Sequence, residues 1–329
     1  LFTRLEHDTG RTHLWLLAPG EKPVRLTPAE SSVQAFAYSP LHGILVYQEA
    51  VSEYGEDFSL FGLKRKALPD GEPVTFFAPP PGRSDHNPVF SPKGDHLAFN
   101  RLNFEQRDEP GYDDGLFIAH YEKGIGAPVK INKINSLKDY VHIPICFSPD
   151  SRYLAIQRAP LAEFATGDSL IIDVEKGTLL HVIKDTWAEG WSPDGKSILL
   201  TAMRKDEPGI GIFIAEVGRQ ERRPITVSGF SDEDPRWSPD GKSILCHSRT
   251  IDGVSLGIWK INVETGDRVL LTERGSYARW ARGGSGFYLL RTPDEERLSP
   301  DIYWMDAKSK FLKKVVENTG DFVLIPWKK

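Results

Sequence analysis

The chain lacks the short motifs that mark the commonest catalytic and cofactor sites. It contains no C-x-x-C pair, no H-E-x-x-H, no P-loop, no dinucleotide-binding glycine fingerprint and no G-x-S-x-G nucleophile elbow. Each motif brings together residues that its chemistry needs, so zinc, phosphate-cradle, nicotinamide and serine-hydrolase sites have no sequence support. We therefore expect no cofactor, no metal and no catalytic residue.

The chain also lacks an excess of positive charge and long apolar runs. The 329 residues carry a formal net charge of −5, which leaves no basic footprint for nucleic acid. No apolar run approaches the roughly 20 residues of a membrane-spanning helix, so we expect no transmembrane segment. Hydrophobic residues make up 40% of the chain, which is enough for a large core.

One phrase recurs along the whole chain. WSPDGKSIL occurs from Trp191 and again from Trp237. Looser copies are YSPLHGILVY from Tyr38, FSPKGDHLAF from Phe90, FSPDSRYLAI from Phe147 and WARGGSGFYLL from Trp280. The leading aromatic, called the turn aromatic below, recurs after 52, 57, 44, 46 and 43 residues. A period of roughly 40 to 50 residues is typical of a propeller or a solenoid.

Each copy predicts a strand, a tight turn and a second strand. Ser-Pro fixes the backbone where no ladder N–H is needed, and the following Gly supplies a positive φ. A third strand follows in most copies, as in LFIAHY from Leu116, SLIIDV from Ser169, GIFIAEV from Gly211, LGIWKINV from Leu256 and DIYWMD from Asp301. A short fourth strand closes the unit, as in PVRLT from Pro23, RPITV from Arg223 and RVLLT from Arg268. Four antiparallel strands per repeat form a propeller blade.

The number of blades depends on both ends of the chain. The first 28 residues provide second, third and fourth strands without a first, and DFVLIPW, from Asp321 to Trp327, provides a first strand without the others. We therefore predict an all-β, seven-bladed β-propeller of four-stranded antiparallel blades, closed by pairing the C-terminal strand with the N-terminal strands. Six blades are the alternative. No linker divides the chain, so residues 1–329 are expected to form a single domain.

The two cysteines fall in different predicted blades. Cys146 lies on a predicted first strand and Cys246 on a predicted second strand, with a whole blade between them. Because disulfides need closely spaced backbones, we expect two buried free thiols.

The aromatic-Ser-Pro-Asp-Gly-Lys turn, the Ile/Leu strand after it and the closing Leu-Thr resemble the TolB-like, or PD40 (WD40-like), β-propeller repeat over essentially the whole chain. The resemblance implies a protein-binding propeller with a periplasmic or secreted location. The same blades occur in propeller halves of prolyl-oligopeptidase-like peptidases and in some polysaccharide lyases. Fold does not transfer function. The ring is expected to close at Trp327 without an α/β-hydrolase domain, which argues against a complete peptidase.

The segments that lead into the first strands are the best candidates for a ligand site. First strands of a propeller run parallel around its axis, so these segments converge on one mouth of the central channel. Polar side chains that converge in a concavity favour ligand binding. The candidate ligand-binding residues are Asp85, His86, Asn87, His142, Glu189, Asp232, Glu233, Asp234 and Arg279. The alternative is that they are solvated loop ends.

Two smaller patterns have a functional and a structural interpretation. His86 and His142 lie at similar places in adjacent blades, where they are candidates for a divalent cation site or a general base, or else for hydrogen-bonded structural histidines. Arginines recur near the end of the second strands, at Arg4, Arg101, Arg158, Arg204, Arg249 and Arg291. One interpretation is that these arginines face an anionic ligand. We favour the other, in which they stabilise the loops by binding carboxylates and backbone carbonyls.

Long loops are expected between second and third strands on the same face as the mouth, the first from Glu49 to Ser59. Repeat insertions on one face mark a binding surface. We therefore predict a non-catalytic module that recognises a protein or glycan partner through this mouth. The alternatives are a polysaccharide lyase acting on uronate-containing glycans and the propeller part of a prolyl-oligopeptidase-like peptidase.

Overall fold

The computed structural model describes the chain except for residues 7, 19–20, 55–57, 107–111, 121–128, 131–139, 161–166, 206, 220, 228, 293–299, 318 and 320–329. The described residues form antiparallel sheets and one short 3-10 turn, η1 (Phe104–Gln106). The strands fall into two compact units, and the second unit begins at Asp185. Among the described residues, no helix has the length and apolar character needed to cross a membrane.

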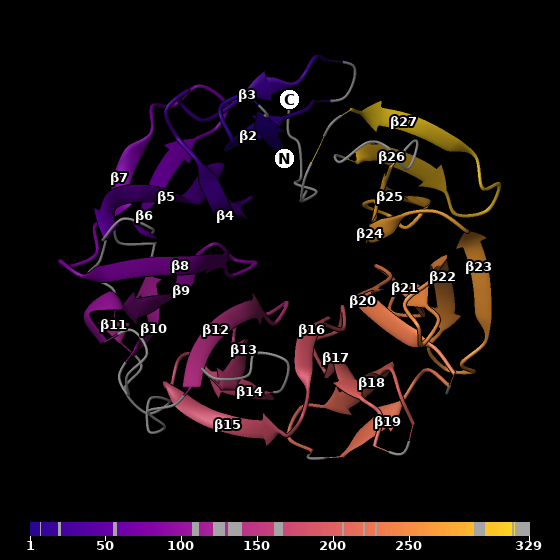
Figure 1. Cartoon of the computed structure of the whole chain (residues 1–329). Helices are drawn as coiled ribbons and strands as arrows, with labels where there is room; N and C mark the ends of the chain where they lie inside the picture. Colours follow the sequence, from indigo (N-terminus) through magenta and orange to yellow (C-terminus); the bar gives the residue numbers. More distant parts are fainter. Residues whose placement is uncertain are drawn as a thin grey trace. The chain divides into compact units, whose positions relative to one another are not determined.

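The first unit contains four sheets, and in each sheet the strands are hydrogen-bonded in chain order (Figure 1). The first sheet has three described strands, β1 (Phe2–Glu6), β2 (Arg11–Leu16) and β3 (Val24–Arg25). The second has β4 (Val33–Ser39), β5 (Ile44–Tyr54), β6 (Phe58–Ala67) and β7 (Val74–Phe77). The third has β8 (Arg83–Phe90), β9 (His96–Asn103), β10 (Asp113–His120) and β11 (Val129–Lys130). The fourth has β12 (Tyr140–Phe147), β13 (Tyr153–Pro160), β14 (Asp168–Asp173) and β15 (Thr178–Ile183).

The second unit contains three sheets with the same order. The first has β16 (Trp187–Trp191), β17 (Ser197–Met203), β18 (Ile210–Glu216) and β19 (Arg222–Pro224). The next has β20 (Ser231–Trp237), β21 (Ser243–Arg249), β22 (Ser255–Asn262) and β23 (Arg268–Thr272). The last has β24 (Ser276–Trp280), β25 (Gly286–Arg291), β26 (Asp301–Asp306) and β27 (Leu312–Val316).

Seven consecutive sheets of this kind are the blades of a β-propeller, which confirms the predicted fold class and seven blades rather than six. The N-terminal sheet lacks its first strand among the described residues, as the sequence predicts. The strand predicted to complete it, from Asp321 to Trp327, lies outside the described residues, so the closure stays a prediction. We call β4, β8, β12, β16, β20 and β24 the first strands.

The recurring turn forms through local hydrogen bonds. The Ser192 hydroxyl donates to Asp194 Oδ1 at 2.6 Å and accepts from the Ser197 N–H at 3.0 Å, while Gly195 has φ +70°. The second exact copy repeats these contacts, and its Gly241 has φ +71°. Only glycine adopts this backbone without steric cost, so the turns form as the sequence predicts.

Turns of neighbouring blades also contact each other. A Cβ on Gly241 would lie 3.6 Å from Pro193 Cδ of the preceding blade, and one on Gly284 would lie 3.8 Å from Pro239 Cδ. In the first unit, the Lys93 N–H donates to Ser151 Oγ in the next blade at 3.0 Å. The turn residues therefore set the spacing between blades as well as reversing the chain.

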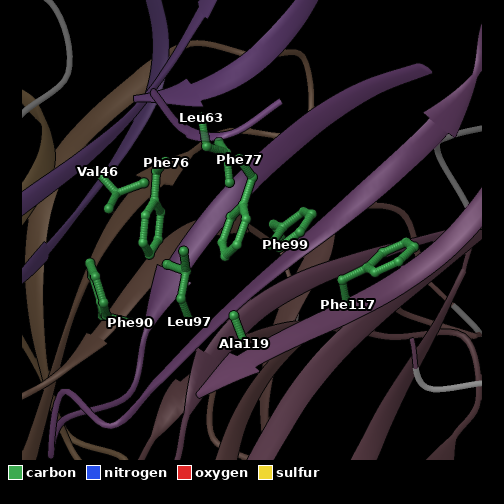
Figure 2. Packing of buried hydrophobic residues seen from close by; sticks show 9 residues of the cluster. All are labelled: Val46, Leu63, Phe76, Phe77, Phe90, Leu97, Phe99, Phe117 and Ala119. Atoms are coloured by element: carbon green, nitrogen blue, oxygen red, sulfur yellow. The ribbon is translucent and has the colours of Figure 1, made fainter. Parts of the chain in front are cut away.

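The core lies between the faces of consecutive sheets. Figure 2 shows one cluster, which joins the second and third sheets and consists of Val46, Leu63, Phe76, Phe77, Phe90, Leu97, Phe99, Phe117 and Ala119. The Phe99 ring is fully buried and stacks on Phe77 at 5.5 Å and on Phe117 at 5.4 Å between ring centroids. Each buried aromatic contributes about 1.5–3 kcal/mol relative to an exposed one. Apolar side chains on strands from adjacent blades thus hold the blades face to face.

Two expectations about local structure are wrong. The predicted loop from Glu49 to Ser59 belongs largely to β5 and β6, which stay paired out to Tyr54 and Phe58. Polar residues there suggested a loop, but a two-stranded ribbon that leaves the core tolerates them. Neither cysteine forms a disulfide, as expected, but only Cys246 is buried, whereas Cys146 is half-buried beside a break in the register of β12.

Candidate functional site

All nine candidate residues lie on first strands rather than in segments that lead into them. Asp85, His86 and Asn87 are on β8, His142 is on β12, Glu189 is on β16, Asp232, Glu233 and Asp234 are on β20, and Arg279 is on β24. First strands of neighbouring blades contact each other within each unit, β4 with β8 and β12 with β8, then β16 with β20 and β20 with β24. The predicted residues therefore belong to the folded scaffold.

Each described first strand carries a β-bulge or a similar break in register. In three of them, a residue with positive φ lies three positions before the turn aromatic: Asn87 (52°), Asp234 (50°) and Tyr277 (49°). Non-glycine residues seldom adopt this conformation. Bulges redirect side chains and are enriched beside functional sites. Simple alternation along these strands therefore does not predict which side chains face a ligand.

The position five residues before the turn aromatic is buried. It holds Asp85, His142 and Asp232, each with 0% of its surface exposed. His86 lies one position later and is half-buried, so the two histidines do not occupy equivalent places. In the described part of the chain, no group of three or more His, Cys, Asp and Glu side chains has the arrangement of a metal site.

Asp85 forms a buried ion pair with Arg101 of β9. Arg101 Nε donates to Asp85 Oδ1 at 2.5 Å and Nη2 donates to Oδ2 at 2.9 Å. The guanidinium also lies 4.7 Å from the centroid of the Phe117 ring. Burial raises the pKa of Asp85, and the hydrogen bonds and charge of Arg101 oppose that shift. Asp85 is therefore a buried, paired carboxylate inside the blade rather than a residue open to a ligand.

His86 belongs to a polar group at the junction of β4, β5 and β8. Gln48 Nε2 lies 3.0 Å from His86 Nδ1 and 3.4 Å from Gln34 Oε1. The amide therefore donates to both, which leaves the proton of the neutral imidazole on Nε2. Burial lowers the pKa of His86 to about 4. Asn87 Nδ2 donates to Asn100 Oδ1 at 3.0 Å.

Asp232 forms the corresponding buried group in the second unit. It accepts hydrogen bonds from Ser248 Oγ at 2.5 Å and from Arg268 Nη2 at 3.0 Å. The Arg268 guanidinium lies 4.8 Å from the ring centroids of both Phe230 and Trp259. Burial, with the nearby charge of Asp232, raises the pKa of the Cys246 thiol. That cysteine is therefore a core residue rather than a nucleophile.

Three of the remaining charged candidates in the second unit, Glu189, Asp234 and Arg279, are joined by Arg236 into one continuous line across three first strands. Arg236 Nη1 donates to Glu189 Oε2 at 2.9 Å, and its Nη2 forms an ion pair with Asp234 Oδ1 at 2.6 Å. Asp234 Oδ2 accepts from Arg279 Nη1, also at 2.6 Å. Thr201 Oγ1 donates to Glu189 Oε1 at 2.9 Å and ends the line on that side. We call Glu189, Arg236, Asp234 and Arg279 the charge line.

The charge line is electrically balanced and half-buried. Its two carboxylates and two guanidiniums have 19%, 28%, 18% and 22% of their side-chain surface exposed, in the order Glu189, Arg236, Asp234, Arg279. Burial raises the pKa of Glu189, and the charge of Arg236 opposes that shift. Arginine forks held by two partners have fixed orientation, so the line presents a preorganised pattern of charge.

Sequence reasoning missed Arg236, although a signal for it exists. Arg236 precedes Trp237 as Arg279 precedes Trp280, so an Arg-Trp pair repeats at the same place in adjacent blades.

Four of the recurring arginines bind carboxylates or carbonyls, as the favoured interpretation predicted: Arg101 with Asp85, Arg158 with Asp168, Arg204 with the Thr226 carbonyl and Arg249 with Glu233. Glu233 is thus held in a separate exposed pair.

A cavity of about 560 Å³ lies elsewhere in the second unit, at the turn ends of two adjacent blades. Its lining includes Ile214, Arg222, Arg223, Trp237 and Val263. None of the nine candidate residues lines it. The charge line is therefore a surface of strands rather than the wall of this cavity.

Solved structures of similar fold include a TolB, a lyase and a peptidase. TolB from Acinetobacter baumannii has a TM-score of 0.54 and 15% identity, over 86% of this chain and 66% of that one. Oligogalacturonate lyase from Vibrio parahaemolyticus has a TM-score of 0.63 and 16% identity, over 95% of this chain and 84% of that one. A puromycin-hydrolyzing peptidase from Mycobacterium tuberculosis has a TM-score of 0.65 and 14% identity, over 98% of this chain and 53% of that one.

At these identities the likeness shows the propeller fold and nothing finer. The chain spans about half the length of the Mycobacterium peptidase. No protein-family model matches the chain, and no curated protein matches it.

Proposed function

We propose that the protein is a non-catalytic binding module that recognises a protein or glycan partner through its first strands, with the charge line of the second unit as the recognition surface. One observation carries the proposal: four charged side chains from three consecutive blades are joined into a single ordered row that remains partly exposed. Fixed charges of alternating sign make the association with a partner specific and orient the partner as it binds. The resemblance to TolB in fold and repeat supports the same conclusion.

The bulges support a recognition role for the same surface. Asp234 reaches both arginines from a backbone with φ 50°, which costs conformational energy that the paired charges offset. Strain retained beside an exposed polar row is typical of binding surfaces. Asp85 and Asp232 are excluded from this surface because both are fully buried in ion pairs.

The test compares partner binding by the intact chain and by a Glu189→Gln, Asp234→Asn variant. Immobilised protein is screened on a glycan array and a peptide array, and the affinity for each hit is measured by calorimetry. We expect the variant to lose about tenfold or more in affinity, because charged hydrogen bonds between partners are replaced by neutral ones. Glu216→Gln is the matched control, since its carboxylate is exposed and pairs with Arg219 away from the charge line.

Turnover is measured in the same series. Incubation with polygalacturonate, followed by ultraviolet absorbance, detects the unsaturated product of a lyase. A steady rise in absorbance that the variant abolishes would replace the binding module with the lyase alternative. Equal affinity of the variant and the intact chain for every hit would move the binding surface away from the charge line.

A second candidate function is the propeller part of a larger peptidase. The specific observation is that 98% of this chain matches 53% of the Mycobacterium peptidase, at a TM-score of 0.65. Sequencing the reading frame on both sides of this segment tests it, because a hydrolase domain encoded next to the propeller would support this candidate. The single-domain organisation and the location outside the cytoplasm stay predictions.

A further inference from the structure

Arg236 and Arg279 occupy equivalent places in adjacent blades but have different partners. Each lies one residue before a turn aromatic, and each donates to a carboxylate of the preceding first strand, Arg236 to Glu189 and Arg279 to Asp234. Arg236 also binds a second carboxylate, Asp234 of its own strand. Arg279 has no second carboxylate among the described residues.

The missing partner corresponds to one sequence position. Asp234 lies three residues before Trp237, and the residue three before Trp280 is Tyr277. The two residues have the same backbone conformation, with φ 50° and 49°, so the scaffold at Tyr277 matches the one that presents Asp234. Tyrosine supplies no carboxylate, and Tyr277 is 50% exposed. The Arg279 guanidinium carbon lies 5.9 Å from the centroid of its ring.

The guanidinium of Arg279 therefore retains an unused edge. A guanidinium has five N–H donors. Nη1 of Arg279 donates to Asp234 Oδ2 and to the Ala278 carbonyl, and in the described chain no hydrogen bond is formed by Nε or Nη2. The Nε and Nη2 donors form the parallel pair that matches the two oxygens of a carboxylate. The Arg279 side chain is 22% exposed, so it is not fully enclosed by the protein.

We propose that a carboxylate of the ligand binds Nε and Nη2 of Arg279, with its apolar neighbouring atoms against the ring of Tyr277. This inference rests on the proposed function, whose recognition surface it extends at its open end. A carboxylate restores at Arg279 the two-carboxylate environment that Arg236 has inside the protein. A planar monoanion suits the place better than a phosphate dianion, because Asp234 already supplies one negative charge to the same guanidinium.

The probe is benzoate, which combines a carboxylate with an aromatic face, and the comparison is benzamide, its neutral analogue of the same shape. Binding is measured by titration followed through the side-chain Nε–H resonances of arginine. We expect benzoate to bind roughly tenfold more tightly than benzamide, since a charged bidentate pair is replaced by neutral hydrogen bonds. The resonance that moves should be absent from Arg279→Gln.

Two variants separate this role from a structural one. Tyr277→Asp places an internal carboxylate where Asp234 stands in the preceding blade, so it should fold, pair with Arg279 and abolish benzoate binding. Arg279→Lys keeps the charge but loses the fork, and should weaken binding roughly tenfold. Arg249→Gln is the matched control, because Arg249 is in an adjacent blade and pairs with Glu233 outside the charge line, and it should bind benzoate normally.

The source of the carboxylate is distinguished by two further pairs of probes. Glucuronate against glucose tests an acidic sugar, and N-acetyl-aspartate amide against N-acetyl-asparagine amide tests an acidic side chain of a polypeptide. A preference for the acid in either pair, lost in Tyr277→Asp, supports the proposal and identifies the source. Equal binding of benzoate and benzamide, or benzoate binding that persists in Arg279→Gln, overturns it. If an array partner still binds Arg279→Gln normally while Glu189→Gln, Asp234→Asn weakens it, this inference fails and the proposed function stands.

Discussion

Replacing Asp85 with Ala leaves the Arg101 guanidinium without its carboxylate in a place where only 10% of its side chain is exposed. Removing one partner of a buried ion pair costs about 3–5 kcal/mol, because the remaining charge keeps its desolvation penalty without compensation. The unfolding entropy of about 2.1 cal/mol/K per residue amounts to about 0.7 kcal/mol/K for the whole chain. Asp85→Ala should therefore lower the melting temperature by about 4–7 °C.

A double-mutant cycle separates the energetic contribution of the ion pair from the cost of leaving one buried charge without its partner. Arg101→Met should be destabilising in its own right, because it leaves the Asp85 carboxylate fully buried. Asp85→Leu combined with Arg101→Met removes both charges and keeps similar volume, so it should recover most of the lost stability. Melting is followed by circular dichroism and repeated in guanidinium chloride. Asp252→Ala, at an exposed loop carboxylate, is the control that should change little.

A small change in the melting temperature of Asp85→Ala would contradict the structural role of this ion pair. A fall of less than about 1.5 °C in Asp85→Ala, which corresponds to about 1 kcal/mol, would show that the pair does not hold the blade together. If that variant also lost affinity for an array partner, Asp85 would belong to the ligand surface after all, and the assignment based on burial would be wrong.

Three other outcomes are expected. Gly257→Ala should be far more destabilising than Gly253→Ala in chemical unfolding: both glycines have positive φ, but only at Gly257 would a Cβ clash with the Thr272 carbonyl oxygen. Equal losses would mean that backbone strain alone decides. Because the pKa of His86 falls to about 4 in the folded state, the unfolded state binds its proton more readily, so stability present at pH 7 is lost as pH falls through 6.5 towards 4, by on the order of 3 kcal/mol. The difference in unfolding free energy between the intact chain and His86→Gln should narrow by that amount between pH 7 and pH 4. A difference that does not change with pH would refute this prediction. A chain ending at Gly320 should melt several degrees lower if the C-terminal strand completes the first blade, and an unchanged melting curve would exclude that closure.

The blade structure was predictable because its signals are local. Most turns contain a Ser-Pro pair and a residue with positive φ, usually glycine, within a few residues. Five of the six turn aromatics, Phe90, Phe147, Trp191, Trp237 and Trp280, are the last residues of their first strands. Hydrogen bonds within four or five residues hold these turns, so the sequence alone determined the repeat, the strand order and the blade count. The same locality explains why the resemblance to TolB-like repeats indicated the correct fold.

The site depended on contacts that no local pattern contains. Asp85 and Asp234 are both acidic residues shortly before a turn aromatic, and the sequence placed them together at one mouth. In the structure, Asp85 is buried against Arg101 of the next strand, while Asp234 joins Arg236 to Arg279 of the next blade. Bulges shift the alternation between these positions, so facing direction cannot be counted along the strand.

The sequence therefore determined that the candidate residues come shortly before the turn aromatics, and the tertiary structure decided that they lie on the first strands, which of them are buried and which form the charge line. The physical reason is that burial and pairing depend on the neighbouring blade, whose distance in sequence is 43 to 57 residues. Arg279 shows this most clearly: its carboxylate partner Asp234 lies 45 residues away, in another blade.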